Sequence, residues 1–451
     1  MVKNFEEKIK NGNKIFQMIR LRQFKGNLGQ AVKNSSYQLS TVIFSRVCAL
    51  IFTIIIARLL MPELFGLYSL ALSTILLFAS FSDLGVGYAA ITFISKKLSE
   101  DKYSKANGYY IFLLRFKIAL LIIISSLLII SSYFVSNFYY NKPIFYALLA
   151  GALYIPLMDL TGFFTNLFVT MDNFRMGLVK EIIFQISRLV LIPLAILIFI
   201  GKFNDNLFIA TIILSLAISY LFSLSFTYRN FKKTKLKRAP FEKLTPKESS
   251  EIKWFMAPLT VTALSGSFFG SIDIIMLGHY VSSEFLGYYQ AAFSLILAAS
   301  AILAFAGNAL FPIMSRLEGT QLENGFRKSL KITFLITILA GIFTYFAAET
   351  IISIAYGQEY SSAVTLLKLF SLILFSAPLI SLYSTYYISQ KHAKEYAILL
   401  VFSTILNIIL NYVLITNFLS RGMLDAVVGA GIATVISRGV YLITLIIFRK
   451  K

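Results

Sequence analysis

Long apolar runs dominate the chain, and short polar stretches separate them. A helix needs about 20 consecutive, mostly apolar residues to cross the hydrocarbon of a bilayer, and about twelve runs reach that length. The pattern therefore predicts an all-α polytopic membrane protein. The predicted spans lie at roughly 37–59, 66–94, 108–133, 143–169, 175–200, 206–228, 254–280, 285–313, 329–354, 362–388, 395–416 and 424–448.

The composition supports this prediction and excludes both a soluble and a disordered protein. Hydrophobic residues make up 57% of the 451 positions, charged residues make up only 14%, and the mean hydropathy is +0.76. A soluble domain has about 45–50% apolar and about 25% charged residues, so this excess cannot be the core of a soluble protein. The same apolar content excludes a disordered chain.

The charge is strongly basic, with 42 Lys and Arg against 21 Asp and Glu and a net charge of +21. In a soluble protein this excess would indicate nucleic-acid binding, but in a membrane protein basic residues gather in cytoplasmic loops. With the N-terminus inside, roughly 32 basic residues fall on the inner side, about 3 on the outer side and about 7 within spans. This bias predicts a multi-pass protein of the cytoplasmic (plasma) membrane, with both termini cytoplasmic and no nucleic-acid partner.

The longest polar stretch divides the predicted spans into six plus six. We expect a cytoplasmic basic amphipathic segment at 1–36, for which a disordered tail is the alternative. An N-lobe at 37–228 follows, then a basic cytoplasmic linker at 229–253 and a C-lobe at 254–451.

An internal repeat relates the two predicted lobes. The segment at 54–73 matches the segment at 275–294 at an offset of 221 residues. Because six is an even number, both lobes enter the membrane from the same side, which makes a parallel pseudo-repeat about an axis along the membrane normal. Two such lobes facing each other predict a transporter with a central cavity, and chance similarity of apolar segments is the alternative. The matched pairs are Glu63 and Glu284, Gly66 and Gly287, Tyr68 and Tyr289, Ala71 and Ala292, and Ser73 and Ser294.

Ionisable side chains inside the spans indicate what the cavity binds. A charge at mid-bilayer costs about 2.5–3.5 kcal/mol, so these groups must face a wet cavity, form pairs or reach an interface. Arg46 lies deep in the first span and Arg438 in the middle of the twelfth, whereas Arg58 is close enough to the outer edge to reach the interface. Basic residues outnumber acids, about seven to four, and a cavity rich in arginine favours an anion such as phosphate or carboxylate. The full set is Arg46, Arg58, Arg115, Lys117, Arg188, Lys368, Arg438, Asp83, Asp159, Glu181 and Asp273.

Residues for catalysis or metal binding are sparse. Cys48 is the single cysteine, and His279 and His392 are the two histidines, so we expect no disulfide, no metal site and no Ser-His-Asp centre. No Walker A pattern is present, and no loop is large enough for a catalytic domain. Asn407 and Asn411, one turn apart in a span, are expected to hydrogen-bond across helices as structural glue. The sequence predicts neither an enzyme nor a bound cofactor.

Several segments resemble the oligosaccharide flippases of the MOP exporter superfamily, the Wzx-like proteins of O-antigen and polysaccharide biosynthesis. The similarity extends over most of the chain, in degenerate motifs whose combination, order and spacing are typical of the superfamily. The motifs are SRVCALIFTIIIARLLMPELFGLYSLAL at 45–72, AYGQEYSSAVTLLKLFSLILF at 355–375, LNIILNYVLI at 406–415 and GAGIATVISRGVYL at 429–442.

The first span is also similar to that of the related lipid II flippases. Ser45-Arg46 and Ala57-Arg58 match the Ser-Arg and Ala-Arg positions of their pattern. Those flippases carry a further arginine six residues after the first, but Phe52 occupies that position here. This departure favours a general glycan-lipid flippase over a lipid II flippase.

The resemblance implies a V-shaped transporter that moves a polyprenyl-diphosphate-linked oligosaccharide from the cytoplasmic to the outer leaflet by alternating access, for cell-surface polysaccharide synthesis. Expected partners are membrane lipids and polysaccharide polymerase or glycosyltransferase proteins. The cavity cations expected to bind substrate are Arg46, Arg58, Arg188 and Arg438. The candidates for coupling to H⁺ or Na⁺ are Asp83 and Asp273, with salt bridges to the cavity arginines as the simpler alternative. Two other functions stay open: a multidrug or other small-molecule exporter of the same superfamily, or a membrane-embedded glycan-assembly enzyme or scaffold.

Overall fold

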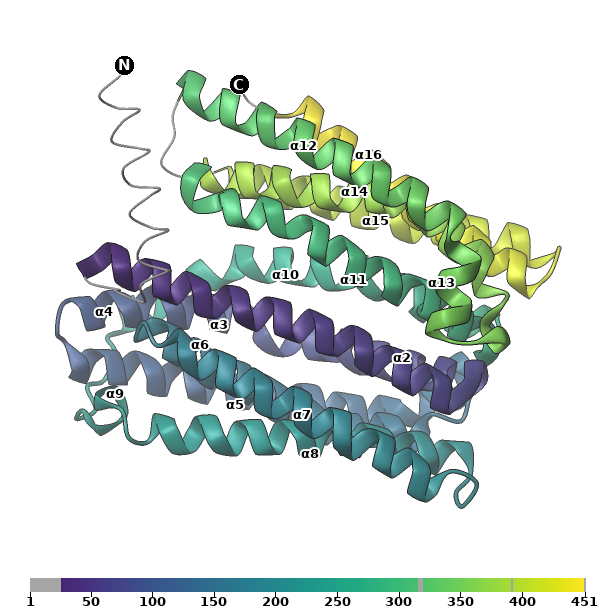
Figure 1. Ribbon diagram of the computed structural model, residues 1–451. Coiled ribbons are helices and arrows are strands. Elements are labelled where there is room, and N and C mark those ends of the chain that lie inside the picture. The colour runs from purple at the N-terminus through teal and green to yellow at the C-terminus, as the bar shows by residue number, and fades with distance from the viewer. Residues whose placement is uncertain (1–25, 315–318, 391, 450–451) are drawn as a thin grey trace.

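The computed structural model describes residues 26–314, 319–390 and 392–449, and these residues form helices joined by short connections (Figure 1). Most of the segment predicted at 1–36 therefore lies outside the described residues, and its last part is the start of α2. The helices are α2 (Gly26–Asp83), α3 (Val86–Ala89), the π-helix η1 (Ala90–Ile94), α4 (Ser95–Ser99), α5 (Tyr103–Phe134), the π-helix η2 (Val135–Tyr140), α6 (Phe145–Thr170), α7 (Phe174–Phe199), α8 (Asp205–Phe231), α9 (Lys235–Arg238), α10 (Pro246–Tyr280), α11 (Ser283–Met314), α12 (Gly319–Phe346), α13 (Ala348–Ala355), the 3₁₀-helix η3 (Gln358–Tyr360), α14 (Ala363–Ser389), α15 (Ala393–Leu419) and α16 (Met423–Ile447).

The twelve predicted spans correspond to eleven long apolar helices in the described part of the chain, because α2 contains the first two spans. The segment of α2 from Lys33 to Asp83 has 51 residues, far more than the roughly 20 residues that cross a bilayer. Met61 interrupts it with a left-handed φ of 59°, and Pro62 follows, where a helix loses a backbone donor. The prediction of an all-α polytopic membrane protein is confirmed.

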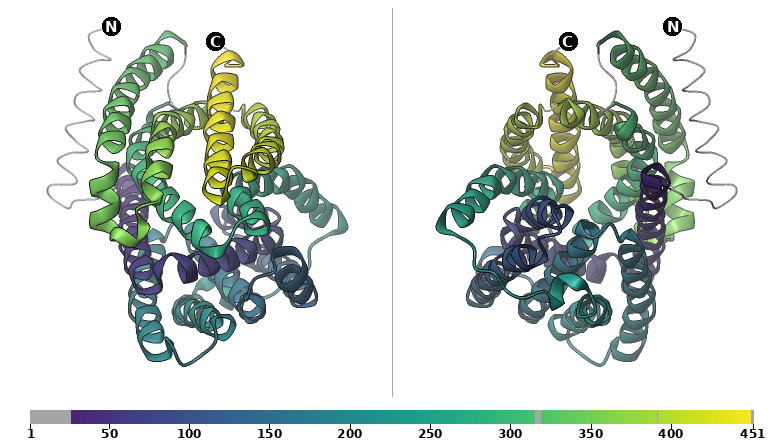
Figure 2. Two further views of the ribbon diagram at one scale, coloured as in Figure 1. Left: turned by 90° about the vertical axis from the view of Figure 1, so that its right-hand side faces the viewer. Right: turned by 90° about the vertical axis from the view of Figure 1, so that its left-hand side faces the viewer.

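The helices form two groups in the order of the chain. Helices α2 to α8 pack against one another, and helices α10 to α16 pack against one another. In the end-on views of Figure 2 the later helices lie above the earlier ones. The long helix α2 joins the groups, since it packs against both α10 and α11. Figure 1 places α4 and α9 at one end of the bundle and α13 at the other, which we call the α9 end and the α13 end.

The seam between α2 and α11 is built on two glycines that the repeat relates to each other. A Cβ atom on Gly66 would lie 1.8 Å from the carbonyl oxygen of Ser283, and a Cβ atom on Gly287 would lie 2.0 Å from the carbonyl oxygen of Pro62. Pro62 and Ser283 are themselves separated by the repeat offset of 221 residues. The glycine of each half therefore packs against the equivalent carbonyl of the other half. Such a reciprocal contact is typical of a local two-fold axis.

Further contacts join the two halves near the α13 end. The hydroxyl of Tyr360 donates to the carbonyl of Ala57 at 2.8 Å. Lys142 Nζ donates to the carbonyl of Gly278 at 2.6 Å, at the last turn of α10. Burial lowers the pKa of Lys142 to about 8. The halves are thus held together at this end by a glycine seam and by side chains that reach backbone carbonyls.

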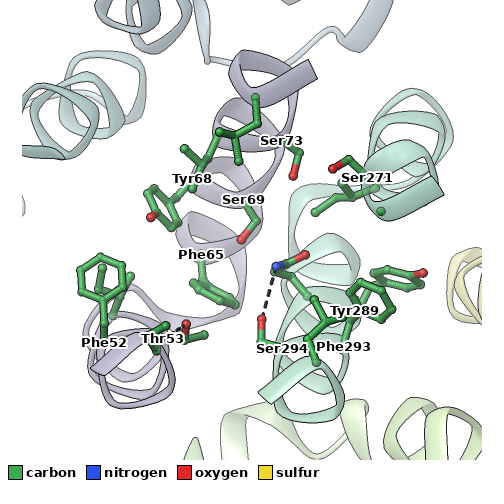
Figure 3. Close-up of a pocket in the computed structure, with 18 of the residues that line it drawn as sticks. Phe52, Thr53, Phe65, Tyr68, Ser69, Ser73, Ser271, Tyr289, Phe293 and Ser294 are labelled. Atoms are coloured by element: carbon green, nitrogen blue, oxygen red, sulfur yellow. Dashed lines mark hydrogen bonds between the residues drawn. The ribbon is translucent and has the colours of Figure 1, made fainter. Parts of the chain in front are cut away.

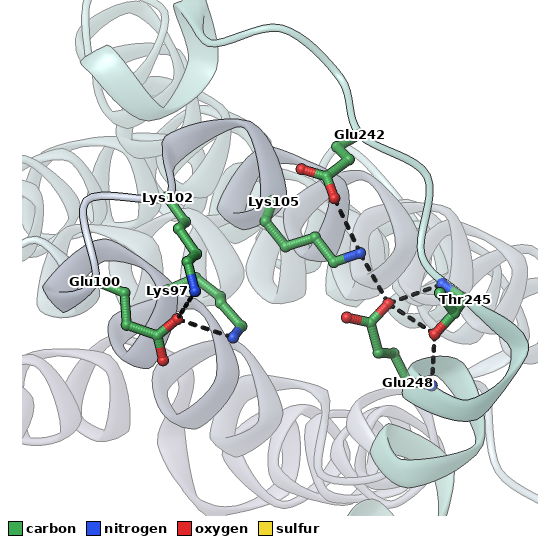
Figure 4. Close-up of polar contacts among 7 residues, drawn as sticks. All are labelled: Lys97, Glu100, Lys102, Lys105, Glu242, Thr245 and Glu248. Atoms are coloured by element: carbon green, nitrogen blue, oxygen red, sulfur yellow. Dashed lines mark hydrogen bonds and ion pairs between the residues drawn. The ribbon is translucent and has the colours of Figure 1, made fainter.

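The connection between the halves is docked at the α9 end (Figure 4). Lys105 at the start of α5 forms ion pairs with Glu242 at 3.2 Å and with Glu248 at 2.9 Å. Thr245 and Glu248 form a capping box that begins α10. Gly108 of α5 lies so close that an added Cβ atom would be 2.0 Å from the carbonyl oxygen of Glu242. The polar stretch between the predicted lobes therefore packs on the first half of the chain.

Candidate functional site

A pocket of about 260 Å³ lies between the two halves, next to the α2–α11 seam. Helices α2 and α7 supply one wall, and α10 and α11 supply the other. Figure 3 shows polar side chains from both walls, with Ser69 and Ser73 facing Ser271 and Ser294. The volume is slightly below the range of about 300–1,000 Å³ that holds a drug-sized ligand, so the pocket suits a head group better than a whole oligosaccharide.

Arg188 of α7 is the predicted cation that lines this pocket. Its guanidinium lies over the ring of Phe52 at 4.3 Å and over the ring of Phe184 at 5.2 Å. The Nε and Nη2 atoms are buried and have no hydrogen-bond partner within the described residues. Glu181, on the same face of α7, pairs instead with the neighbouring Lys180. Arg188 thus keeps a positive charge and free donors beside a cavity, which is the arrangement that an anion requires.

Arg438 of α16 lies behind the opposite wall. Its guanidinium is 5.1 Å from the ring of Phe269 and 5.8 Å from the ring of Phe293, and Phe293 lines the pocket. The Nε atom of Arg438 is buried and unpaired within the described part of the chain. Arg438 therefore contributes positive potential through an aromatic layer and does not line the pocket itself.

Arg46 precedes the pocket-lining residues of α2, whereas Arg58 stands among them in the sequence without lining the pocket. Arg46 is exposed, and a spacing of three and seven residues places it on the same helix face as Ala49 and Thr53, which line the pocket. Arg58 is directed elsewhere, because its Nε donates to the carbonyl of Ala355 at 2.8 Å and its Nη2 to that of Ile354. The structure therefore places Arg188 in the pocket wall and Arg46 on the face of α2 that carries the lining residues Ala49 and Thr53. It places Arg58 at the C-terminus of α13.

Asp273 of α10 is a buried carboxylate in the pocket wall, with only 2% of its surface exposed. The hydroxyls of Tyr289 and Thr434 donate to its Oδ2 at 2.8 and 2.6 Å, and Asn411 Nδ2 donates to its Oδ1 at 2.6 Å. Its hydrogen-bond partners are thus three neutral groups from α11, α15 and α16. The alternative of a salt bridge from Asp273 to a cavity arginine does not hold within the described residues.

Asp83 lies outside the pocket, at the end of α2. The helix stops there because Leu84 and Gly85 both adopt left-handed backbone, with φ of 41° and 81°. Lys117, which is 1% exposed, lies 3.0 Å from Asp83 Oδ1 and 3.0 Å from Asp159 Oδ2. The partner of Asp83 is therefore a buried lysine of α5, and not one of the predicted cavity arginines.

Sequence reasoning missed most of the uncharged groups of this site. The prediction that Asn411 bridges helices is confirmed, but nothing in its spacing points to Asp273 as its partner. Thr434 and the pocket serines carry no charge and stand in apolar runs where many serines only bond their own helix. The one available signal is the repeat, since Tyr289 and Ser294 belong to its matched pairs.

Comparisons with known proteins agree with this architecture. The family model described as polysaccharide biosynthesis protein matches residues 31–318, and the model described as MatE matches residues 258–413. Among solved structures, the lipid II flippase MurJ in an inward closed conformation covers 90% of this chain and 87% of its own, with a TM-score of 0.66 and 17% identity. An inward-facing multidrug resistance MATE family transporter of the MOP superfamily covers 92% and 94%, with a TM-score of 0.62 and 13% identity.

One curated relative is a probable low-salt glycan biosynthesis flippase, Agl15 of Haloferax volcanii, which is 26% identical over 183 residues. The match spans 39% of this chain and 37% of that relative. The structural likeness establishes the fold, and the family model covers well over half of the chain. The chain therefore belongs to the polysaccharide biosynthesis protein family, multi-pass membrane proteins of the MOP superfamily.

Proposed function

We propose that this protein moves a polyprenyl-diphosphate-linked oligosaccharide from the cytoplasmic to the outer leaflet for cell-surface polysaccharide synthesis. One observation carries the proposal: Arg188 lines a pocket between the two halves, and its buried Nε and Nη2 atoms have no hydrogen-bond partner within the described residues. An arginine held at membrane depth with free donors is costly unless a ligand uses them. A diphosphate offers the negative oxygens that a guanidinium binds best.

The two halves, predicted at 37–228 and 254–451, would rock about the α2–α11 seam in alternating access. We propose that the protein lies in the plasma membrane with its α9 end facing the cytoplasm. The basic residues of the linker and of the α4–α5 connection lie at that end. The head group would enter from that side while the polyprenyl chain stays in lipid. An inside-negative potential would then favour exit of the anion by about 2.3 kcal/mol per charge per 100 mV.

Arg46 and Arg438 would assist from the two sides of the pocket. Arg46 stands on the pocket face of α2 toward the α9 end, where an entering head group passes first. Arg438 adds positive potential behind Phe293. Asp273 and Asp83 remain the candidates for coupling to H⁺ or Na⁺, and Asp273 is the better placed because it lines the pocket.

The test is complementation of a deletion strain with protein levels matched. Arg188→Ala should reduce surface glycan at least about tenfold, since a hydrogen bond to a charged group contributes about 1.5–3 kcal/mol. Arg421→Ala is the control, because Arg421 also lies over an aromatic ring, Phe418 at 5.0 Å, but on the turn between α15 and α16. The deletion strain should accumulate a lipid-linked sugar on the cytoplasmic leaflet. Normal glycan display without the protein would exclude the proposed function.

A second candidate is a multidrug or small-molecule exporter. The match to the MatE model and the likeness to multidrug transporters support it. The cation at the pocket argues against organic cations as cargo, because like charges repel at a desolvated site. A deletion strain that loses resistance to organic cations and keeps its surface glycan would select this candidate.

A further inference from the structure

The pocket lies on the local two-fold axis that the glycine seam defines. Ser69 and Gln290 are related by the offset of 221 residues, as are Ser73 and Ser294, and all four line the pocket. They follow Gly66 and Gly287 along the same two helices, so the relation that holds at the seam extends to the pocket walls. Each half thus presents polar side chains at equivalent positions (Figure 3).

Several of these hydroxyls are free of the bond that a serine in a membrane helix usually makes. Thr53, a neighbour in the pocket wall, donates to the carbonyl of Ala49 at 2.9 Å in the common manner. Within the described part of the chain, the hydroxyls of Ser69, Ser73 and Ser271 make no hydrogen bond. On the other wall Gln290 Nε2 donates one hydrogen to Ser294 Oγ at 3.3 Å, which leaves its second amide hydrogen free.

Each of these side chains can donate a hydrogen bond into one small space, and a cation stands beside them. Arg188 adds buried N–H groups, whereas the carboxylate oxygens of Asp273 are already occupied by three donors. A pocket of this kind fits a ligand with many acceptor oxygens. Because the donors come in two related sets, it fits a ligand whose acceptors also come in two related sets. A diphosphate is such a ligand, since two equivalent phosphates flank one bridging oxygen.

We propose that the pocket clamps a diphosphate across the local two-fold axis, with one phosphate on Ser69 and Ser73 of α2 and the other on Gln290 and Ser294 of α11. This assignment rests on the proposed function and adds to it a reason for choosing a diphosphate over a monophosphate. A monophosphate can use only one half of the clamp. A carrier with a diphosphate link engages both halves, so its release requires the halves to separate.

The test measures equilibrium binding of inorganic pyrophosphate and of inorganic phosphate to the full-length protein in lipid nanodiscs. Ser73→Ala and Ser294→Ala should each weaken pyrophosphate binding about tenfold, from the loss of one hydrogen bond to a charged group. Either variant alone should change phosphate binding by less than about twofold, because the other half still binds it. Ser73→Thr keeps the hydroxyl and should keep the wild-type affinity. Ser219→Ala is the control, since that buried serine of α8 donates to the Ser215 carbonyl, away from the pocket.

Two results would overturn the clamp. One is pyrophosphate binding that depends on Arg188 and is unchanged in both serine variants, or is weakened in only one of them. The other is an absence of pyrophosphate binding by the wild-type protein. Full restoration of surface glycan by Ser73→Ala and Ser294→Ala in the deletion strain would likewise reject the clamp and leave the proposed function standing. A deletion strain with normal glycan would reject the proposed function, whatever the serine variants bind.

Discussion

The two walls of the pocket are built on related backbone and carry different chemistry. Tyr68 and Tyr289 occupy equivalent positions, but the position equivalent to Asp273 is Phe52. In the second half Tyr289 donates to the carboxylate of Asp273, whereas in the first half the guanidinium of Arg188 lies over the ring of Phe52. One wall therefore holds a carboxylate whose oxygens are already occupied by donors, and the other holds a cation whose donors are free. The related backbone supplies both walls of the pocket, and the side chains that differ set the charge of each wall.

The largest expected effect is a loss of stability when either glycine of the seam shared by the two halves is replaced. Gly66→Ala and Gly287→Ala place a Cβ atom 1.8 and 2.0 Å, respectively, from a carbonyl oxygen of the other half, far inside van der Waals contact. The backbones must separate, so we expect each variant to lose at least about 1–3 kcal/mol of stability and most of the folded protein. The measurement is thermal unfolding in detergent together with the yield of monodisperse protein.

Gly162→Ala and Gly439→Ala are the controls for the seam, because no atom of the described residues lies within 4 Å of a Cβ atom at those positions. They should be neutral or slightly stabilising, since alanine is favoured over glycine by about 1 kcal/mol in a helix. The seam variants should also resemble each other, because the contact is reciprocal. A stable Gly66→Ala protein beside an unstable Gly287→Ala protein would contradict the local two-fold relation.

The next largest effect is expected from a substitution that gives both walls a carboxylate. Phe52→Asp gives the first half the carboxylate that the second half has, directly under the guanidinium of Arg188. The new carboxylate should pair with Arg188 and occupy its free donors, which lowers transport of an anionic head group by about 10- to 100-fold. Phe52→Leu removes the ring without adding charge and should retain most activity. Equal transport by Phe52→Asp and Phe52→Leu would show that Arg188 does not bind the anion.

A smaller effect separates the two acids predicted for coupling. We expect an ion gradient to stimulate transport by the wild-type protein in proteoliposomes several-fold. Asp273→Asn keeps the shape of a group that lines the pocket and removes its charge, so this variant should lose that stimulation. Asp83→Asn should retain that stimulation, because Lys117 keeps its pair with Asp159 at 3.0 Å. The measurement is uptake of labelled lipid-linked sugar with and without H⁺ or Na⁺ gradients. If Asp83→Asn removes the response and Asp273→Asn does not, the assignment is reversed.

The sequence predicts the parts of this molecule that depend on periodicity and on charge. Apolar runs of fixed length predict the spans, and the short match around Gly66 and Gly287 predicts the relation between the halves. Charge alone does not say where a side chain points, and so the sequence predicts the same substrate-binding role for Arg58 and Arg188. In the structure Arg58 donates to carbonyls of α13, whereas Arg188 lines the pocket.

The uncharged residues of the site could not be predicted from the sequence, because the sequence does not show where their side chains point. A serine in an apolar run usually donates to the carbonyl of the preceding turn, so its presence says little about a pocket. Ser69 and Ser73 differ from Thr53 in lacking that bond, which is a property of the folded helix. The pairing of Asp83 with Lys117 likewise depends on how α2 ends against α5, and no spacing in the sequence encodes it.

The smallest effect concerns how firmly the two halves are joined at the α13 end, and it depends on pH. Burial lowers the pKa of Lys142 to about 8 while it contacts Gly278, and an exposed lysine has a pKa of about 10.4. The joined state therefore binds fewer protons than the separated state between these values, so raising the pH through this window favours the joined state by linkage. Below pH 8 the ammonium form is buried at a cost, and the contact is weakest. Spin labels at the exposed Asn141 and Ser282 should report a population of the short distance that rises about two- to fivefold from pH 8 to pH 10. Lys142→Met should abolish that rise, and a rise that persists in this variant would assign the pH response to another group.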